Sequence, residues 1–467
     1  MIFFVDYINE NIKMKNANRR DFIKKASILS LNAGILSKSN FSIISKKSNK
    51  PFILGGEKTI NPGQWIKWPI WDAEKDEKIL LDVMRSGVWS RSKTVIQFEQ
   101  AWAKLIGSKR CMTVVNGTNA LIIALHQSQI NAGDEVIVTP YTFIATIQSI
   151  LANGAIPIFV DVDPTTFQMD PAKIEAKITK RIKAIMPVHI LGLPSDMIRI
   201  MAIAKKHNLT VIEDACQAPL AEINHQKVGT FGNAACFSFQ NSKNIAIGEG
   251  GAIISDDDAF MDACYSYHNL GLPYGIATGS VTAGSQMQAN KLRFSEYQAA
   301  IGLAQLTRLE AQTETRNQNA AYLTSLLKAI PGIHVLRLYP EVTKAAYHLY
   351  PFRYDPSAFK GLSRAQFLQA LDAEGVPCMG GYTALNTQPF LKQTFESVNF
   401  KKMYHSGELN YSQYMEENQC PLNDTLCNEA VWFTQNMLLG TKNDMDLIFQ
   451  AIQRIHTHAD EIKKKLQ

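Results

Sequence analysis

The chain contains one lysine in a setting that suits covalent chemistry. Lys243 lies in the segment "FSFQNSKNIAIGEGGAI", between a short strand-like run and a glycine-rich turn at 248–251. A lysine that forms a Schiff base with a carbonyl must be held still, and its ammonium must lose its proton easily. Lys243 is therefore a candidate for covalent catalysis, although a single lysine after a strand is more often a solvated side chain.

Two segments could together bind a phosphate group. In "VVNGTNAL", Gly117 lets the backbone approach a ligand closely, and Thr118 begins a predicted helix whose first N–H groups suit an anion. Ser238, five residues before Lys243, could bind the same phosphate through its hydroxyl. Considered alone, "VVNGTNAL" is explained about equally well as an Asn-Gly turn with a threonine cap.

Two further loops could hold a flat heterocyclic ring. In "TPYTFIAT", Phe143 could stack on such a ring, although packing in the core is the commoner role for a phenylalanine. In "VIEDACQA", Asp214 follows an apolar strand and Gln217 comes three residues later. A carboxylate there can pair with a protonated ring nitrogen, which makes a pyridinium an electron sink. For Asp214 alone, a helix N-cap is the simpler interpretation.

These groups together match what pyridoxal 5′-phosphate requires of a protein. A phosphate loop, an aromatic side chain, a carboxylate and a lysine occur in that order within one predicted sheet. Each has an ordinary structural explanation, but the joint occurrence by chance is far rarer than any one of them. The sequence therefore predicts pyridoxal phosphate as the cofactor, with Lys243 as the lysine that binds it.

The elements that must position these residues follow an alternating pattern. Short apolar runs such as "DEVIVTP", "IPIFVDV" and "LTVIEDA" are separated by helical stretches. This alternation predicts an α/β fold with a mostly parallel sheet covered by helices on both faces. Such sheets bind ligands at the carboxyl ends of their strands, where the candidate residues occur. A nicotinamide-binding Rossmann enzyme is disfavoured because no G-x-G-x-x-G follows the first strand.

The chain is long enough for more than one domain. We expect a leader and linker over 1–50, a large cofactor-binding domain over 51–320 and a smaller C-terminal α/β domain over 321–467. A long helical pattern that begins at Ser295 is expected to bridge the two domains.

Composition excludes several classes of function. Of the 467 residues, 46% are apolar and 19% charged, which is ordinary for a globular protein. The net charge of +6 comes from the first 50 residues, so the folded body is nearly neutral and does not predict a nucleic-acid surface. No apolar run is long enough to span a membrane, and the seven cysteines have no metal-ligand spacing.

The first 50 residues resemble an export leader. Arg19 and Arg20 are followed by Phe22, two lysines and a short apolar stretch, as in a twin-arginine signal. The pattern predicts export to the periplasm. The alternative is a cytoplasmic protein with a basic tail, because the apolar stretch is interrupted by polar residues and lacks a clean cleavage site.

Beyond these single patterns, the sequence resembles the DegT/DnrJ/EryC1/StrS family of sugar aminotransferases over about 65–456. The resemblance rests on segments such as "IEDACQA", "VGTFGNAACFSFQNSKNIAIGEGGAI" and "LRFSEYQAAIGLAQL". It implies the aspartate-aminotransferase architecture, known as fold-type I of the pyridoxal phosphate enzymes. It also implies a homodimer whose active sites are shared between subunits.

The resemblance assigns roles to the candidate residues. Lys243 would bind the cofactor and shuttle protons, and Asp214 would pair with the ring nitrogen. Gln217 would contact the phenolic side of the ring, on which Phe143 would stack. The phosphate ligands would be Gly117, Thr118 and Ser238, together with Lys291 reaching from the neighbouring subunit.

The implied activity is transfer of an amino group from glutamate or glutamine to a keto-sugar or keto-cyclitol. The segments "GVPCMGGYTALN" and "VWFTQNMLLG" are most similar to members that act on keto-cyclitols. One alternative is a sugar dehydratase or deoxygenase, but that branch of the family carries histidine in place of the lysine. The other is a regulatory protein that keeps the fold and cofactor without turnover. In this chain Pro219 replaces a histidine that often follows the Asp/Gln pair.

Overall fold

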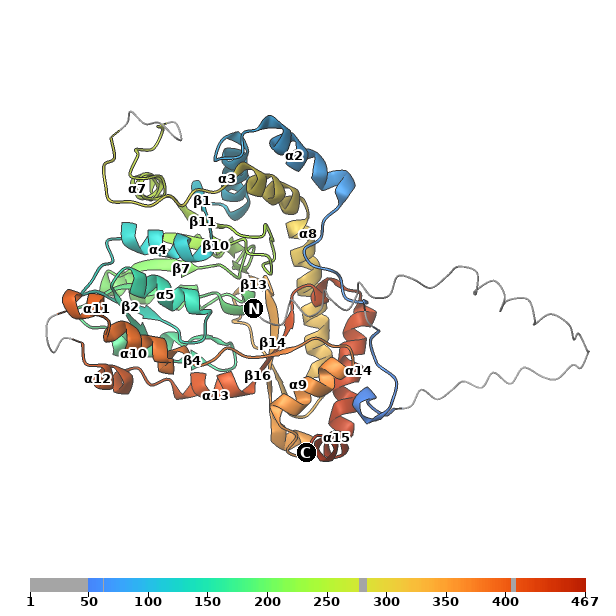
Figure 1. Ribbon diagram of the computed structural model, residues 1–467. Coiled ribbons are helices and arrows are strands. Elements are labelled where there is room, and N and C mark those ends of the chain that lie inside the picture. Colours follow the sequence, from blue (N-terminus) through green and yellow to red (C-terminus); the bar gives the residue numbers. More distant parts are fainter. Residues whose placement is uncertain (1–48, 62, 277–283, 405–408) are drawn as a thin grey trace, which may run out of the picture. The chain divides into compact units, whose positions relative to one another are not determined.

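The computed structural model describes residues 49–61, 63–276, 284–404 and 409–467 (Figure 1). These residues belong to one compact unit, Ser48–Gln467. The predicted leader lies almost wholly outside the described residues, as do the twin arginines. Within the described ranges, no helix is both long and apolar enough to cross a membrane.

A seven-stranded sheet forms the centre of this unit, in the order β1-β11-β10-β7-β6-β2-β3. All neighbouring pairs are parallel except those that involve β11, which runs antiparallel to β1 and β10. The strands are β1 (Arg110–Val114), β2 (Glu135–Val138), β3 (Ile156–Phe159), β6 (Ile182–Met186), β7 (Thr210–Asp214), β10 (Ala234–Ser238) and β11 (Gly251–Ser255). The predicted mostly parallel sheet is confirmed.

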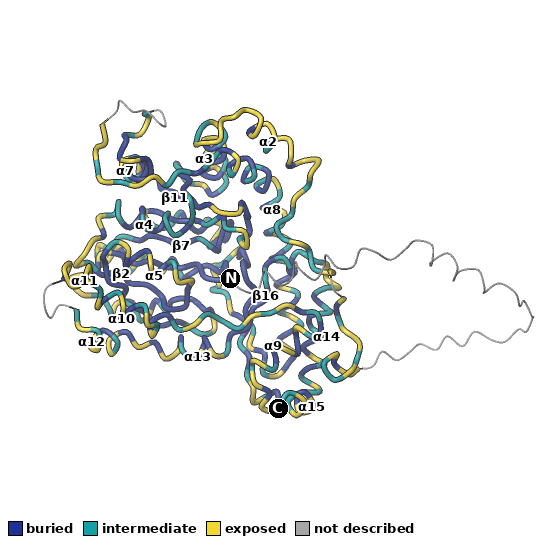
Figure 2. Tube along the Cα trace, in the orientation of Figure 1, coloured by how far each residue is buried: buried dark blue, intermediate teal, exposed yellow. Residues whose placement is uncertain are grey.

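Apolar residues on both faces of the strands explain why this sheet is buried, as Figure 2 shows by the dark strands at its centre. Because successive side chains of a strand point to opposite faces, Val136 and Val138 join one core cluster and Ile137 joins the other. Helices α4 (Gly117–Gln127) and α5 (Ile144–Ala152) contribute to the first cluster. Helices α3 (Lys93–Ile106) and α6 (Met197–His207) contribute to the second.

A second, antiparallel sheet in the order β12-β14-β16-β15 lies wholly within the predicted C-terminal domain. Its strands are β12 (Ile333–Val335), β14 (Leu349–Tyr354), β15 (Met379–Gly380) and β16 (Ala430–Thr434). Helix α8 (Glu296–Leu327) matches the long helix predicted from Ser295, which caps it, and it contacts both α3 and β12. One small sheet pairs β4 (Val162–Asp163) with β5 (Gln168–Met169). In another, β8 (Glu222–Ile223) pairs with both β13 (Val342–Lys344) and β9 (Gln226–Lys227).

The remaining helices surround the two sheets. They are α2 (Ala73–Ser86), α7 (Asp258–His268), α9 (Arg364–Ala373), α10 (Pro389–Phe395), α11 (Val398–Met403), α12 (Tyr411–Glu417), α13 (Pro421–Glu429), α14 (Lys442–Thr457) and α15 (Ala459–Lys465). The segment at the start of the predicted large domain is tied to the C-terminal part, because the N–H groups of Phe52 and Thr59 donate to the buried carboxylate of Glu374.

The buried carboxylate of Glu213 holds the end of β7 on the side of the strand opposite to Asp214. Glu213 is fully buried and points away from the neighbouring Asp214, as alternation in a strand requires. It accepts hydrogen bonds from the N–H groups of Gly229, Phe231 and Gly232, at 2.7–2.8 Å, and its Oε2 lies 2.9 Å from Nε2 of His189. These bonds hold the 229–232 turn against the strand that carries Asp214.

We expect Glu213→Ala to lower the free energy of unfolding by about 3–5 kcal/mol, because one buried and two partly buried N–H groups and the buried His189 lose their acceptor. Urea denaturation followed by circular dichroism measures the change. Glu175→Ala is the matched control, since Glu175 pairs with Lys206 and His207 at the surface and its loss should cost under about 1 kcal/mol. Equal losses from the two variants would contradict this role for Glu213.

Candidate active site

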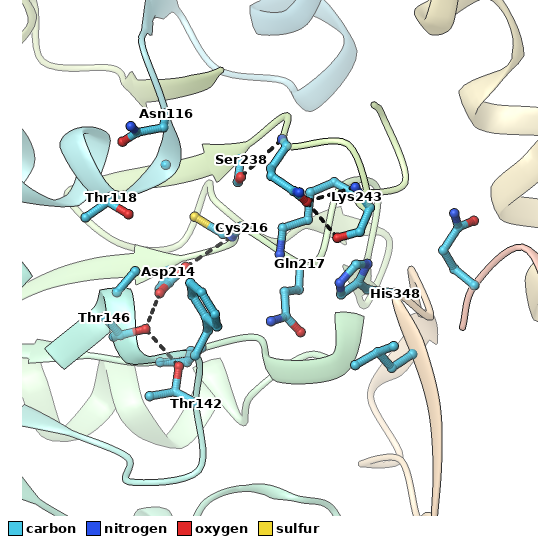
Figure 3. Close-up of a pocket in the computed structure, with 18 of the residues that line it drawn as sticks. Asn116, Thr118, Thr142, Thr146, Asp214, Cys216, Gln217, Ser238, Lys243 and His348 are labelled. Atoms are coloured by element: carbon cyan, nitrogen blue, oxygen red, sulfur yellow. Dashed lines mark hydrogen bonds between the residues drawn. The ribbon is translucent and has the colours of Figure 1, made fainter. Parts of the chain in front are cut away.

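The carboxyl ends of four strands of the seven-stranded sheet meet at one cavity of about 560 Å³. Many of the polar residues that line it end or follow β1, β2, β7 and β10 in the chain, and a further wall comes from residues in and around β14 and β16. Seven of the eight predicted site residues line this cavity: Gly117, Thr118, Phe143, Asp214, Gln217, Ser238 and Lys243. The close-up in Figure 3 includes most of them.

Lys243 presents its amine to the cavity without a partner. Its backbone N–H donates to Gln240 O at 2.8 Å, which fixes the turn after β10. None of the described residues makes a hydrogen bond or an ion pair with its Nζ. Burial lowers the pKa of the Lys243 ammonium, while nearby Cys216 and Asp214 act in the opposite direction. The amine is therefore both accessible to a ligand and easier to deprotonate than a surface lysine.

The start of α4 forms the anion-binding end of the cavity. Asn116 caps the helix by accepting a hydrogen bond from Asn119 N at 2.9 Å. The N–H groups of Gly117 and Thr118 come earlier in the first turn, where a helix provides no acceptor, so they are available to an anion. Gly117 is required here, because a Cβ would lie 2.9 Å from both Cys216 Sγ and the Cβ of Ser238. The glycine lets this helix start lie directly against the end of β10.

Asp214 is a buried carboxylate without a cationic partner. Its Oδ2 accepts from Thr146 Oγ1 at 2.7 Å, and its Oδ1 accepts from Cys216 N at 3.2 Å (Figure 3). In the part of the chain that the structure describes, no lysine, arginine or histidine forms an ion pair with it. A buried negative charge of this kind is stabilised by a cation in the cavity.

Gln217 is held in a fixed orientation. Its Oε1 accepts from Leu191 N at 2.8 Å, and its Nε2 donates to the hydroxyl of Tyr382 at 2.9 Å. Tyr382, which also lines the cavity, is partly buried, and desolvation of its hydroxyl raises the pKa of Tyr382 to about 12. This bond connects the seven-stranded sheet to the C-terminal part of the chain.

Phe143 is not a core residue. It is the N-cap of α5, and 54% of its surface is exposed although it lines the cavity. An exposed aromatic face of this kind is available to a planar ligand. The alternative interpretation, packing in the core, is wrong because no core cluster contains it.

Lys291 lies outside the cavity. It is exposed and pairs with Asn269 in an isolated bridge. Its predicted contact with a phosphate requires a second copy of the chain and stays a prediction. Glu296, in the same "R-x-x-E" element, has a local task, since its carboxylate accepts from the N–H groups of Ser92, Thr94 and Val95 at the start of α3.

His348 is a cavity residue that sequence reasoning missed. Asn244 Nδ2 donates to Ala346 O at 2.7 Å, so Asn244 Oδ1 must be the acceptor in its 3.3 Å contact with His348 Nδ1. His348 Nδ1 therefore carries the proton, and Nε2 has a free lone pair. Burial, with Lys243 and Arg316 nearby, holds the pKa of His348 well below its usual range. In the sequence, His348 stands directly before the strand-like run that forms β14, and this position alone does not indicate a site residue.

Comparison with known proteins shows which family the chain belongs to. The family model described as the DegT/DnrJ/EryC1/StrS aminotransferase family matches residues 71–431. The L-glutamine:2-deoxy-scyllo-inosose aminotransferase of Streptomyces kanamyceticus is 31% identical over 84% of this chain and 94% of its own length. A pleiotropic regulatory protein of Geobacillus stearothermophilus is 37% identical over 70% of this chain and 83% of its own.

A solved structure agrees with these sequence relatives. The aminotransferase from Psychrobacter cryohalolentis superposes with a TM-score of 0.75 and 29% identity, covering 85% of this chain and all of that one. The expected fold-type I architecture is confirmed by such neighbours. The chain belongs to the DegT/DnrJ/EryC1/StrS aminotransferase family.

Proposed function

We propose that this aminotransferase uses pyridoxal phosphate to move an amino group from glutamine or glutamate to a keto-cyclitol or keto-sugar. The observation that carries the proposal is the composition of one cavity. Among the residues that the structure describes, the lysine amine in this cavity has no partner and the buried carboxylate has no cation, and the helix start beside them is open to an anion. These three groups suit the aldehyde, the ring nitrogen and the phosphate of the cofactor.

The residues present fit this cofactor. The start of α4 with Gly117 and Thr118, together with the hydroxyl of Ser238, would hold the phosphate. Phe143 would stack on the ring and Asp214 would hold a proton at its nitrogen. Gln217, fixed by its two hydrogen bonds, would lie beside the ring.

Bound at this site, pyridoxal phosphate supplies an aldehyde that accepts amino groups and a ring that withdraws electrons from bonds at that carbon. The protein's part is acid–base chemistry in a restricted cavity. Lys243 Nζ accepts the proton from the α-carbon of the amino donor and delivers it in the next step. Over both half-reactions the donor leaves as a 2-oxo acid, and its amino group replaces the carbonyl oxygen of the acceptor.

Both substrates are inferred from relatives. The Streptomyces kanamyceticus enzyme is named for L-glutamine and 2-deoxy-scyllo-inosose, and the fold, the lysine and the carboxylate all agree with that type of reaction. The alternative dehydratase activity is disfavoured because Lys243 is present. A non-catalytic regulatory role is kept as a second candidate, because a relative carries the name pleiotropic regulatory protein.

Isotope transfer tests the proposal. The protein with pyridoxal phosphate is incubated with glutamine labelled with ¹⁵N at the α-amino group and with scyllo-inosose, 2-deoxy-scyllo-inosose or nucleotide-linked keto-sugars. We expect the label in an amino product by mass spectrometry. A cofactor spectrum that responds to no amino donor would instead support the regulatory role, and loss of a hydroxyl from the acceptor would support the dehydratase.

A homodimer is also part of the proposal. Leu270 and Tyr274 are large exposed apolar residues in the segment beside Lys291, and Trp89 and Tyr297 are exposed around the start of α8. Exposed apolar surface of this kind is typical of an interface between copies. Light scattering that reports only a monomer at micromolar concentration would contradict the dimer.

Export by the twin-arginine route stays a proposal that rests on Arg19, Arg20 and the residues after them. A protein that carries its cofactor must fold before transport, and this route transports folded proteins. Sequencing of the N-terminus of the protein from separated cell fractions tests it. An uncleaved chain found only in the cytoplasmic fraction would contradict export.

A further inference from the structure

Arg316, in the middle of α8, is a buried cation without a carboxylate. Its side chain is fully buried, and among the described residues no aspartate or glutamate forms an ion pair with it. Burial lowers the pKa of its guanidinium to about 9. Its Cζ lies 5.5 Å from the centroid of the Trp68 ring, and its Nη1 has no hydrogen-bond partner among the described residues. Such a charge is costly unless something compensates for it.

Among the described residues, Gln435 is the side chain that accepts hydrogen bonds from Arg316. Both Nε and Nη2 of Arg316 donate to Gln435 Oε1, at 3.0 and 2.6 Å. A guanidinium has donors only, so the amide oxygen must face Arg316 and the amide nitrogen must face away. Gln435 follows β16 (Ala430–Thr434) and lines the active-site cavity. In the described part of the chain, nothing accepts a hydrogen bond from its Nε2.

This arrangement gives the cavity a hydrogen-bond donor with a positive charge directly behind it. The guanidinium polarises the amide, which makes its N–H groups on the other side stronger hydrogen-bond donors. Two carboxylates line the cavity, Asp214 and Glu249, and Asp214 already accepts from Thr146 and Cys216. An anionic oxygen is the best partner for the amide, because it also compensates for the buried charge of Arg316.

We propose that Gln435, held by Arg316, binds the carboxylate of the amino donor. The inference rests on the proposed function, in which glutamine or glutamate and the sugar-like acceptor enter the same cavity in turn. The donor carries a carboxylate on the carbon that reacts. A keto-cyclitol is neutral, and a nucleotide-linked keto-sugar carries its charge on the diphosphate rather than beside the reacting carbonyl, so either acceptor gains less from a buried charge behind the amide. Gln435 is thus a binding residue, and Arg316 is a positioning residue that acts through it.

The variant Gln435→Glu tests whether Gln435 binds the donor carboxylate or only maintains the structure around Arg316. The introduced carboxylate would pair with Arg316, so the thermal midpoint should stay the same or rise. The amide N–H groups that would donate hydrogen bonds into the cavity are lost, and a negative charge takes their place. The KM for glutamine should therefore rise about 30-fold or more, with less than about a 3-fold change in the KM for the acceptor.

Gln240→Glu is the matched control, made with the cofactor in excess. Gln240 lines the same cavity, and its Oε1 already accepts from the N–H and hydroxyl of Ser242, so the same change of amide to carboxylate keeps its bonds. The KM for glutamine should change by less than about 3-fold in this variant. A similar rise in both variants would overturn the proposal, because a general charge effect would explain it.

A binding measurement makes the test independent of turnover. Calorimetry with the cofactor-loaded protein compares glutaramate, which has the carboxylate of glutamine but no α-amine, with glutaramide, which replaces that carboxylate by an amide. The proposal expects glutaramate to bind at least about 10-fold more tightly than glutaramide, and this preference should disappear in Gln435→Glu.

The outcomes distinguish this inference from the proposed function. If wild-type protein transfers no amino group but prefers glutaramate through Gln435, the function fails and the carboxylate site stands. If wild-type protein is active and Gln435→Glu keeps its KM for glutamine, the inference is overturned. It is overturned equally if the KM for the acceptor rises instead.

Discussion

Replacing Lys243 with alanine is expected to reduce kcat for amino transfer by at least about a thousand-fold. The variant loses the lysine amine that, among the described residues lining the cavity, can both bind the cofactor and carry the donor's proton. The start of α4, Ser238, Phe143 and Asp214 remain, so pyridoxal phosphate should still bind without a covalent bond. The ¹⁵N-transfer assay measures the loss, and the absorbance of the bound cofactor reports its altered state.

Two controls show whether the loss of activity in Lys243→Ala comes from the missing amine rather than from damage to the fold. The thermal midpoint should stay close to that of the wild-type protein, because no described residue depends on a hydrogen bond from Lys243 Nζ. A small primary amine such as ethylamine, added at high concentration, should restore part of the activity by replacing the missing base. A variant that kept more than a tenth of the wild-type kcat would contradict the role of Lys243.

Asp214→Asn should lower kcat by about a hundred-fold or more, with little change in folding. The substitution preserves shape, and the asparagine oxygen can still accept from Thr146 or Cys216. It removes the negative charge that would keep the ring nitrogen protonated, so the ring would withdraw electrons less strongly. Steady-state kinetics with saturating cofactor measures the change.

Thr146→Val is the control for Asp214→Asn. It removes the 2.7 Å hydrogen bond to Asp214 Oδ2 but leaves the charge in place, so its effect on kcat should stay below about 10-fold. If Thr146→Val were as damaging as Asp214→Asn, the hydrogen-bond network rather than the charge of Asp214 would be responsible.

Much of the cavity could be predicted because local sequence determines the ends of the strands. β7 is buried around Val211 and Ile212 and ends at Asp214, and the first residues after β10 lead directly to Lys243. In a parallel sheet such ends lie at one edge, so residues distant in sequence converge without any knowledge of side-chain contacts. Gly117 was singled out for its backbone, and the structure gives the reason in its contacts with Cys216 and Ser238.

Other parts of the site could not be found in this way. Arg316 looks like an ordinary residue in a polar helix, and its burial depends on how α8 packs against residues near 435. His348 gains its tautomer from Asn244, more than one hundred residues away in sequence. Exposure also decides between alternatives that a pattern leaves open, as it did for Phe143. The role of Lys291 depends on a second copy of the chain.

The most direct test of the whole account is to locate the cofactor on the chain. The purified protein is saturated with pyridoxal phosphate, treated with borohydride to make any link to an amine permanent, digested and analysed by mass spectrometry. The account predicts one modified peptide, with the cofactor on Lys243, and none in Lys243→Ala. Modification of a different lysine, or of none, would contradict the central claim.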